Sequence, residues 1–507
     1  MDYLLGLDIG TTSTRAIIID EDGKLVASSI KDYPLITPKP GWAEQNPEDW
    51  WNATVYTIKD TIESSNISPK DISCVGLSGQ MHGSVFLDKE GKVIRPAILW
   101  CDQRTQAQCD KIYKIFGYDD FIKLSYNKAL PGFTAPKILW LREVEPESYK
   151  KVSQILLPKD YIRYRLSGKY ATEVSDASGT ILMDITSRNW SDEILDGLKI
   201  SKDLLPQVYE SAEVTSYVNY SASSVTGLLE GTPIVGGASD NAAGAVGSGI
   251  VKERLLSDSI GTSGVVFACT SKPLYDRLGR VHSFCHALPH MWHLTGVTLS
   301  AAGSLKWYYD RFGPSKNIVD TYPDIKGYNL LNKQAENVSP ASDGLIFLPY
   351  LSGERTPHGD PYARGVFFGL SYIHGQDHFV RSIMEGVAFS QLDCLSLMKE
   401  VGITSDKVVL FGGGAKSKVW RQIISDVMDT KIVTLNIEEG PAYGAALLAG
   451  VGAGIYKSVE EATSRTIRQV SQINPIRKNV KKYRKIYEIY KSLYEDLKED
   501  FKKLNAI

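Results

Sequence analysis

Two short turns that combine glycine with hydroxyl residues recur in the chain, and both have the composition of a phosphate-binding loop. The first is Gly10-Thr11-Thr12-Ser13 and the second is Gly261-Thr262-Ser263-Gly264. Glycine leaves its backbone N–H open to an anion, and threonine and serine hydroxyls can donate hydrogen bonds to phosphate oxygens. One such turn is also typical of an ordinary β-hairpin. The second copy favours a pair of loops that hold a polyphosphate from opposite sides.

Charged residues flank the first turn. Asp8 precedes it at the end of an apolar run, and Arg15 follows it. A carboxylate beside a phosphate loop suits Mg²⁺, which prefers oxygen ligands and keeps several waters, and a guanidinium can neutralise phosphate charge. We therefore expect Asp8 near a magnesium ion and Arg15 near phosphate. A solvated aspartate in a hairpin is the alternative.

Asp240 is the only acidic residue in a segment of small residues, 236–244, which follows the apolar run 233–235. Small neighbours allow a ligand to approach its carboxylate. Transfer of a phosphoryl group to an alcohol needs a group that accepts the hydroxyl proton as the P–O bond forms. Asp240 is the candidate for this base, although Asp followed by Asn and two alanines also suits a helix N-cap.

Polar side chains are concentrated among glycines in the segment 76–83, which follows a predicted strand. Gln80 and His82 in this loop can bind the hydroxyl groups of a sugar, and Trp100 and Asp102 downstream add an aromatic face and a charge suited to a polyol. A solvent-exposed loop with an incidental histidine is the alternative for this segment.

Three consecutive glycines, 412–414, separate a predicted strand from a predicted helix. Glycine there lets the backbone approach a flat ligand such as adenine, although a tight strand-to-helix turn needs glycine as well. The chain contains neither G-x-x-x-x-G-K-[ST] nor the H-R-D and D-F-G motifs, so the P-loop and protein-kinase designs are excluded.

Four of the eight histidines lie between His282 and His293, beside Cys285. Their spacing matches no usual zinc motif, Pro289 interrupts a helical register, and the chain has no second ligand cluster. We expect these histidines to be packed in the interior or to line a cleft.

The two turns are attached to strands in a pattern that appears twice. Apolar runs at 3–8, 16–19 and 25–28, with turn residues between them, predict an antiparallel meander, and the runs 255–260 and 265–269 flank the second turn in the same way. Mixed strand and helix patterns lie between the two copies. The predicted fold class is therefore α/β with two related halves.

Helical patterns are present over 137–142, 379–401 and 480–501. In the last of these, apolar and aromatic residues recur three and four positions apart: Val480, Tyr483, Tyr487, Tyr490, Tyr494, Leu497 and Phe501. This amphipathic helix is expected to pack its aromatic stripe against the body of the chain, with a surface for a homodimer as the alternative.

The length and composition bound the class of protein. A chain of 507 residues exceeds what one hydrophobic core supports, so we expect two domains, 1–249 and 250–507, with a cleft between them. The 57 Lys and Arg nearly balance the 59 Asp and Glu, which indicates no nucleic-acid surface. Scattered cysteines and the lack of an apolar stretch of ~20 residues predict a cytoplasmic protein with reduced thiols and no membrane partner.

Six segments, in order along the chain, carry a resemblance to a known family. They are GLSGQMHG (76–83), AILWCDQRT (97–105), DASGT (176–180), SDNAAGAVG (239–247), YLSGERTPH (350–358) and LFGGGAKSKVWRQ (410–422). From Leu5 to about Tyr456 the chain resembles the FGGY carbohydrate kinases. The resemblance implies two actin-like, ribonuclease-H-like domains that enclose ATP and a sugar in the cleft between them.

The resemblance also implies roles for individual residues. Asp240 would be the catalytic base, Met81 and His82 would lie at the sugar, and Asp8 would stand near Mg²⁺. The other expected site residues are Thr11, Thr12, Ser13 and Arg15 at the phosphates, Gly261 and Thr262 opposite them, Gly413 and Gly414 at the adenosine, and Gln80, Trp100, Asp102 and Asn241 at the sugar.

The expected reaction is phosphorylation of D-xylulose by ATP to D-xylulose 5-phosphate. The alternatives are a kinase for another ketose, polyol or sugar acid, such as ribulose, erythritol or gluconate, and a non-enzymatic actin-like protein that senses sugar. The chain departs from the family pattern at Cys101, where asparagine is usual, and at Ser239, where glycine is common. These departures bear on the choice of sugar more than on the chemistry.

Overall fold

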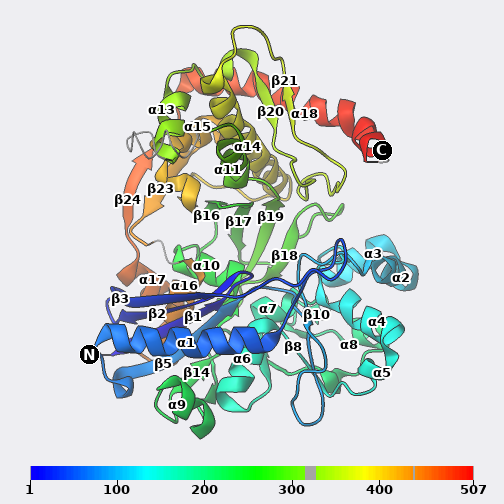
Figure 1. Ribbon diagram of the computed structural model, residues 1–507, viewed down its shortest axis with the longest axis vertical. Helices are drawn as coiled ribbons and strands as arrows, with labels where there is room; N and C mark the ends of the chain where they lie inside the picture. Colours follow the sequence, from blue (N-terminus) through cyan, green and yellow to red (C-terminus); the bar gives the residue numbers. More distant parts are fainter. Residues whose placement is uncertain (1, 314–326, 438–439, 506–507) are drawn as a thin grey trace.

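Two β-sheets with the same strand plan form the centres of the two halves of the chain (Figure 1). The computed structural model describes residues 2–313, 327–437 and 440–505. In the first sheet, β1 (Tyr3–Ile9), β2 (Ser13–Asp20) and β3 (Leu25–Asp32) form an antiparallel meander. β1 also pairs in parallel with β5 (Ile72–Gly79), followed by β14 (Pro233–Val235) in parallel and β13 (Val214–Tyr217) antiparallel.

The second sheet repeats these pairings strand for strand. β16 (Leu256–Ile260), β17 (Gly264–Thr270) and β19 (Trp292–Thr298) form its meander, and β18 (His282–Cys285) adds one further edge strand. β16 pairs in parallel with β22 (Lys407–Phe411), followed by β23 (Lys431–Leu435) in parallel and β24 (Gln469–Ile473) antiparallel. The repetition confirms the predicted α/β class and the predicted duplication.

Helix α16 (Gly440–Gly452) comes from the C-terminal part of the chain but packs on β1 and β5 of the first sheet and on α10 (Asp240–Gly247). The backbones approach closely because glycines lie at the contact: a Cβ on Gly6 would be 2.0 Å from the carbonyl oxygen of Ala442, and one on Gly76 would be 1.8 Å from that of Ala445. The C-terminal part therefore contributes to the packing of both sheets, and the domain boundary at residue 249 stays a prediction.

We expect Gly76→Ala to destabilise the protein, because the added methyl group cannot fit without moving β5 away from α16. Overpacking of this kind costs about 1–3 kcal/mol or more. The midpoint of thermal unfolding, measured by calorimetry, should fall by several degrees. Gly375→Ala is the matched control, since a Cβ there would meet no atom within 4 Å. Equal midpoints for the two variants would contradict the contact.

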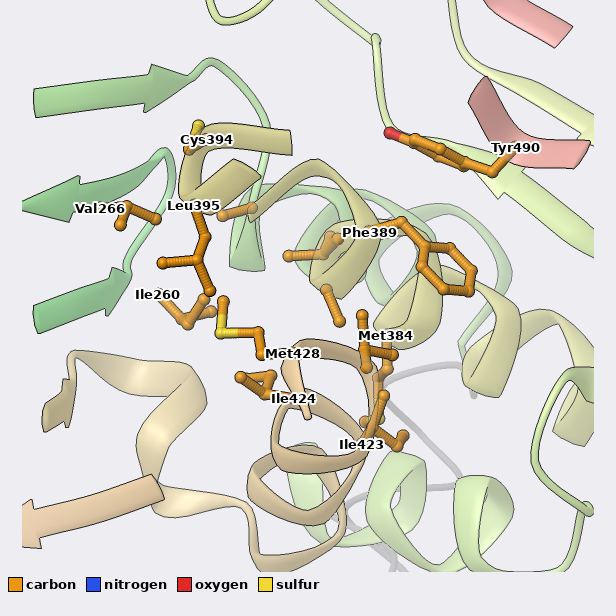
Figure 2. Close-up of a cluster of buried hydrophobic side chains, with 14 of the residues drawn as sticks. Ile260, Val266, Met384, Phe389, Cys394, Leu395, Ile423, Ile424, Met428 and Tyr490 are labelled. Atoms are coloured by element: carbon orange, nitrogen blue, oxygen red, sulfur yellow. The ribbon is translucent and has the colours of Figure 1, made fainter. Parts of the chain in front are cut away.

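The second half has a large apolar core beneath its sheet. Side chains of α14 (Gln376–Glu400) and α15 (Lys418–Met428), among them Met384, Phe389 and Ile424, converge there with Ile260 of β16 (Figure 2). The predicted C-terminal helix is α18 (Arg477–Leu504), and its aromatic stripe is largely buried against this core. The stripe therefore packs on the chain's own body, as predicted, while a homodimer stays a prediction.

The first half also carries a helical insertion, from α2 (Gln106–Phe116) to α8 (Asp192–Leu198), which lies beside the first sheet (Figure 1). β18 and β19 of the second sheet pack against this insertion: Asn127 Nδ2 donates to the Ser283 carbonyl at 2.7 Å, and Trp292 Nε1 donates to the Ile185 carbonyl at 2.7 Å. The two halves thus meet at the insertion as well as at α16. None of the helices within the described residues has the length and apolarity to cross a membrane.

Candidate active site

Two carboxylates meet where the halves face each other. Asp8 lies near the end of β1, and Asp240 is the first residue of α10. Burial, followed by the charge of Asp8, raises the pKa of Asp240 to about 7. Burial also raises the pKa of Asp8 to about 6, against the opposing effects of the Ser78 hydroxyl and the Arg15 guanidinium. Both carboxyl groups are therefore poised to titrate near neutral pH, and within the described residues the buried Asp8 Oδ1 has no hydrogen-bond partner.

The N-cap of α10 is Ser239 rather than Asp240. The Ser239 hydroxyl oxygen accepts from the Ala242 N–H at 3.4 Å, whereas the Asp240 Oδ1 accepts from the adjacent Asn241 N–H at 2.7 Å. Asp240 lines a cavity of about 190 Å³ together with Asn241, Ser257 and Phe411. The N-cap alternative for Asp240 is therefore wrong, and its carboxylate faces the cleft.

The second strand-turn unit places its own aspartate differently. Ser257 and Ser259 of β16 line the cavity, so the alternating side chain of Asp258 points to the opposite face of the sheet. Asp258 is fully buried, and burial raises its pKa to about 8. The aspartate lies one residue further from the glycine than in the first unit, and this shift moves it from the cleft to the core.

The first glycine-threonine turn is fixed through its carbonyl groups. The Tyr33 hydroxyl donates to the Gly10 carbonyl at 2.5 Å, and Gln45 Nε2 donates to the Thr11 carbonyl at 2.7 Å. Among the described residues, no hydrogen bond uses the N–H of Thr11 or Thr12. The turn therefore presents backbone N–H donors to the cleft. Arg15 of β2 lies opposite Asp8 of β1 in the antiparallel pairing of the two strands.

The second turn is fixed in a similar manner, but by backbone N–H groups at the start of α11 (Ala302–Phe312). The Ala302 N–H donates to the Gly261 carbonyl at 2.8 Å, and the Ala301 N–H donates to the Thr262 carbonyl at 2.8 Å. Thr262 is exposed, as Thr12 is in the first turn. Both turns thus hold carbonyl groups in internal hydrogen bonds.

A cavity of about 490 Å³ adjoins the carboxylates at the glycine turn after β22. It shares Gly244 and Phe411 with the smaller cavity, and its wall includes Gly413, Lys416 and Arg421. A Cβ on Gly413 would meet no atom within 4 Å, so its backbone borders open space, whereas Gly414 packs against Ile260. Of the two predicted glycines, only Gly413 lines the cavity.

Met81 and His82 continue from the carboxylates on the other side of the cleft. Asn241 Nδ2 donates to Met81 Sδ at 3.4 Å. His82 has a positive φ of 66°, and its carbonyl accepts from Lys137 Nζ at 2.8 Å. His82 Nδ1 lies 2.6 Å from the Gly179 carbonyl, which can only accept, so Nδ1 carries the hydrogen.

His82 is uncharged in this environment. Burial, together with the charge of Lys137, lowers its pKa well below the usual value. A neutral imidazole protonated at Nδ1 has an acceptor at Nε2. His82 is therefore equipped to accept a hydrogen bond from a hydroxyl group.

The other predicted sugar residues are held by protein groups. Trp100 Nε1 donates to the Thr11 hydroxyl at 2.9 Å, which joins the sugar side to the phosphate side. Gln80 is 1% exposed and donates to the Gly10 carbonyl at 3.2 Å. Asp102 is fully buried and accepts from the Ala43 N–H at 2.7 Å and from Arg104 Nη2 at 2.7 Å. Gln80 and Asp102 thus position neighbouring loops.

A buried ionic network, which the sequence analysis did not find, lies behind the Asp240 loop. Lys159 Nζ is 2.7 Å from Asp160, 3.4 Å from Asp176 and 3.5 Å from Glu173, and all four side chains are fully buried. Glu173 accepts from the Ser175 hydroxyl at 2.9 Å, and the Ser175 oxygen accepts from the Ser239 N–H at 3.0 Å. The network therefore reaches the residue before Asp240.

Arg163 completes this support. It donates to the Val235 and Gly236 carbonyls, each at 2.6 Å, and so fixes the chain that leads to Asp240. The sequence contains a signal for this network, because charged residues gather at the start of α6 (Pro158–Ser167). Only the tertiary structure shows that these charges are buried.

Three of the four clustered histidines, His282, His286 and His293, are buried as expected. The prediction is wrong for His290, which is exposed and has a positive φ of 58°. His286 Nε2 lies 2.9 Å from the Ile250 carbonyl, and His293 stacks on Phe267 with ring centroids 4.4 Å apart. His282 lies near His82, with Phe133 between them. Within residues 2–313, 327–437 and 440–505, no group of three or more His, Cys, Asp or Glu side chains could hold a metal ion.

Comparisons with known proteins agree with this architecture. Residues 3–247 match the N-terminal domain of the FGGY family of carbohydrate kinases, and residues 256–453 match its C-terminal domain. The chain is 40% identical to a xylulose kinase of Bacillus subtilis (strain 168), over 98% of both proteins, and 32% identical to a gluconokinase of the same organism, over 98% of this chain and 97% of that protein.

Solved structures show the same arrangement. A ligand-bound xylulose kinase from Lactobacillus acidophilus superposes with a TM-score of 0.91 at 26% identity, covering 99% of this chain and 100% of that one. A gluconate kinase from the same organism also gives a TM-score of 0.91 at 26% identity, covering 99% of both chains. The fold is thus shared by kinases with different acceptors.

Proposed function

Because the chain belongs to the FGGY family of carbohydrate kinases, we propose that it transfers the γ-phosphoryl group of ATP to D-xylulose and forms D-xylulose 5-phosphate. The observation that carries the choice of sugar is the identity of 36–40% to several proteins named xylulose kinase over nearly the whole chain. The gluconokinase relative, at 32%, makes gluconate the second candidate.

Asp240 is the proposed catalytic base. The terminal hydroxyl oxygen of the sugar attacks the γ-phosphorus, Asp240 accepts the hydroxyl proton, and the bond from the γ-phosphorus to the bridging oxygen breaks so that ADP leaves. A pKa near 7 is well matched to this task, because the carboxylate is then ionised often enough to accept a proton and basic enough to hold it.

Asp8 is the proposed contact to Mg²⁺. Within the described residues its buried Oδ1 has no hydrogen-bond partner, and a carboxylate oxygen is the hard donor that Mg²⁺ prefers. When bound, the ion would neutralise the phosphate oxygens. The residues of the chain then position the nucleotide around it.

The two turns are proposed to hold the phosphates from opposite sides. Thr11, Thr12, Ser13 and Arg15 would contact them from the first half, and Gly261 and Thr262 from the second. Gly413 would border the adenosine in the larger cavity, with Gly414 supporting it from behind. Charge stabilisation and positioning by such groups supply most of the catalysis in phosphoryl transfer.

The sugar is proposed to lie along Met81, His82, Trp100 and Asn241. Gln80 and Asp102 act indirectly, through the loops that they hold. Coupled measurement of ADP release with D-xylulose, ribulose, gluconate, glycerol and erythritol tests the assignment. We expect the highest kcat/KM with D-xylulose, and a higher value with gluconate would overturn the choice of sugar while leaving the kinase reaction intact.

A further inference from the structure

The far wall of the proposed sugar pocket comes from the second half of the chain. His282 of β18 is 4% exposed, and neither of its ring nitrogens has a hydrogen-bond partner within the described residues. Its ring centroid lies 5.5 Å from that of Phe133, which lies 4.5 Å from that of His82. An unpaired buried polar side chain costs free energy in the empty protein, so a bound group that pairs with it is favoured.

Arg355 adds a cation to the same wall. Its backbone is anchored, because the Arg355 N–H donates to Glu354 Oε1 at 2.8 Å and the next residue, Thr356, donates to the Val297 carbonyl at 3.0 Å. Within residues 2–313, 327–437 and 440–505 its guanidinium takes part in no hydrogen bond or ion pair. The Thr356 hydroxyl also donates to the Arg280 carbonyl at 3.0 Å, so Arg355 is held beside the segment that leads into His282. In agreement with this, burial and then the Arg355 charge lower the pKa of His282, and the same charge contributes to the lowered pKa of His82.

The residues of the proposed sugar pocket follow one another in order from Asp240 to His282. Asp240 lies at one end, Asn241 contacts Met81, and His82, Phe133 and His282 follow in order through direct contacts or ring neighbours. A sugar whose reacting hydroxyl is at Asp240 therefore extends its opposite end toward His282 and Arg355.

The chemistry of the acceptor gives that end a carbonyl group, if D-xylulose is the substrate as proposed above. The C5 hydroxyl that receives the phosphoryl group is the hydroxyl that closes the furanose ring by adding to C2. Only the open-chain ketone, with a free C2 carbonyl, can therefore react. A carbonyl oxygen only accepts hydrogen bonds, and a guanidinium only donates them.

We propose that Arg355 binds the free C2 carbonyl of the open-chain ketose and that His282 pairs with the neighbouring C1 hydroxyl, so that this wall selects the reactive form of the sugar. The neutral imidazole has one donor and one acceptor, which match a hydroxyl group. The residues act on the end of the acceptor remote from the chemistry and determine which acceptors bind.

Arg355→Met tests the proposal against two ligands of the same length. Xylitol has a hydroxyl in place of the C2 carbonyl and is measured as a competitive inhibitor. A hydrogen bond to a charged group is worth about 1.5–3 kcal/mol, so kcat/KM for D-xylulose should fall about 10- to 100-fold. The Ki of xylitol should change by less than about 5-fold. Its C2 hydroxyl can both donate and accept a hydrogen bond, so it depends less than a carbonyl on a partner that only donates.

Three controls make the result decisive. Arg355→Lys keeps the charge and should recover part of the lost kcat/KM. Arg477→Met, at an exposed residue, should change neither kcat/KM for D-xylulose nor the Ki of xylitol. Unchanged ADP affinity in Arg355→Met shows that the variant is folded. If Arg355→Met weakened the use of D-xylulose and the binding of xylitol equally, or affected neither, the inference would be overturned. If the wild-type protein does not use D-xylulose at all, the proposed function fails first, and the two failures are distinguishable.

Discussion

Asp240→Asn is expected to lower kcat by about 10²-fold or more while leaving nucleotide binding intact. Asparagine keeps the shape of the side chain but cannot accept the hydroxyl proton. Single-turnover and steady-state rates with saturating sugar and ATP measure the effect, and calorimetric titration with ADP measures the binding. Wild-type turnover in the variant would refute the base assignment.

The pH dependence gives the same prediction a second readout. Asp240 must be ionised to accept a proton, and burial together with the Asp8 charge raises its pKa to about 7. The kcat/KM of the wild-type protein should therefore rise with pH and level off above about 7, and this inflection should disappear in Asp240→Asn.

Asp258→Asn is the matched control, since this aspartate occupies the repeated strand of the second half but faces the core. Its pKa of about 8 means that it is mostly uncharged at pH 7, so asparagine is a close replacement. If Asp258→Asn also lost most of its turnover, the Asp240 result would reflect the loss of a buried aspartate near the turns. It would then not show that Asp240 accepts the proton.

Lys159→Met is expected to have the largest effect on stability. Although burial favours the neutral amine, the charges of Asp160, Asp176 and Glu173 raise the pKa of Lys159, so its ammonium group holds these three buried side chains together. Burial raises the pKa of Asp176 well above the usual value, which favours its neutral form. Removal of one partner from a buried ion network costs about 3–5 kcal/mol. The midpoint of denaturant unfolding should fall accordingly, and turnover should fall with it because Glu173 supports Ser239 through Ser175.

Lys123→Met serves as the control for that experiment. Lys123 forms an ion pair with Asp120 at 3.0 Å, but both side chains are largely exposed, and such pairs contribute at most about 1 kcal/mol. If the two lysine variants had the same stability, the buried network would not have the role inferred here.

Local sequence patterns were sufficient to predict the strands, the turns and the C-terminal helix, and they also pointed to the proposed base. The meanders, the turns after β1 and β16, and the helix α18 depend on residues close together in the chain, where alternation, turn residues and helical spacing apply directly. Asp240 was recognisable because its neighbours are small, which is again a property of consecutive residues.

Tertiary structure decided which of the predicted residues line a cavity and which are held by protein contacts. Asp102 and Gln80 have suitable chemistry, but contacts with the Ala43 N–H and the Gly10 carbonyl occupy them, and those two partners lie far away in the chain. Gly414 packs on Ile260, although the sequence does not distinguish it from Gly413.

The same limit applies to the residues that the sequence analysis did not assign to the sugar. Arg355 and His282, which are proposed to contact the sugar, belong to the second half, and β18 and β19 of that half pack on the insertion of the first. α16 packs on the first sheet where glycines permit a close approach. The sequence by itself determined the fold class and the turns, and it singled out Asp240 as the proposed base. Which side chains surround the acceptor was decided by the packing of distant segments, because partner and distance are properties of the folded chain.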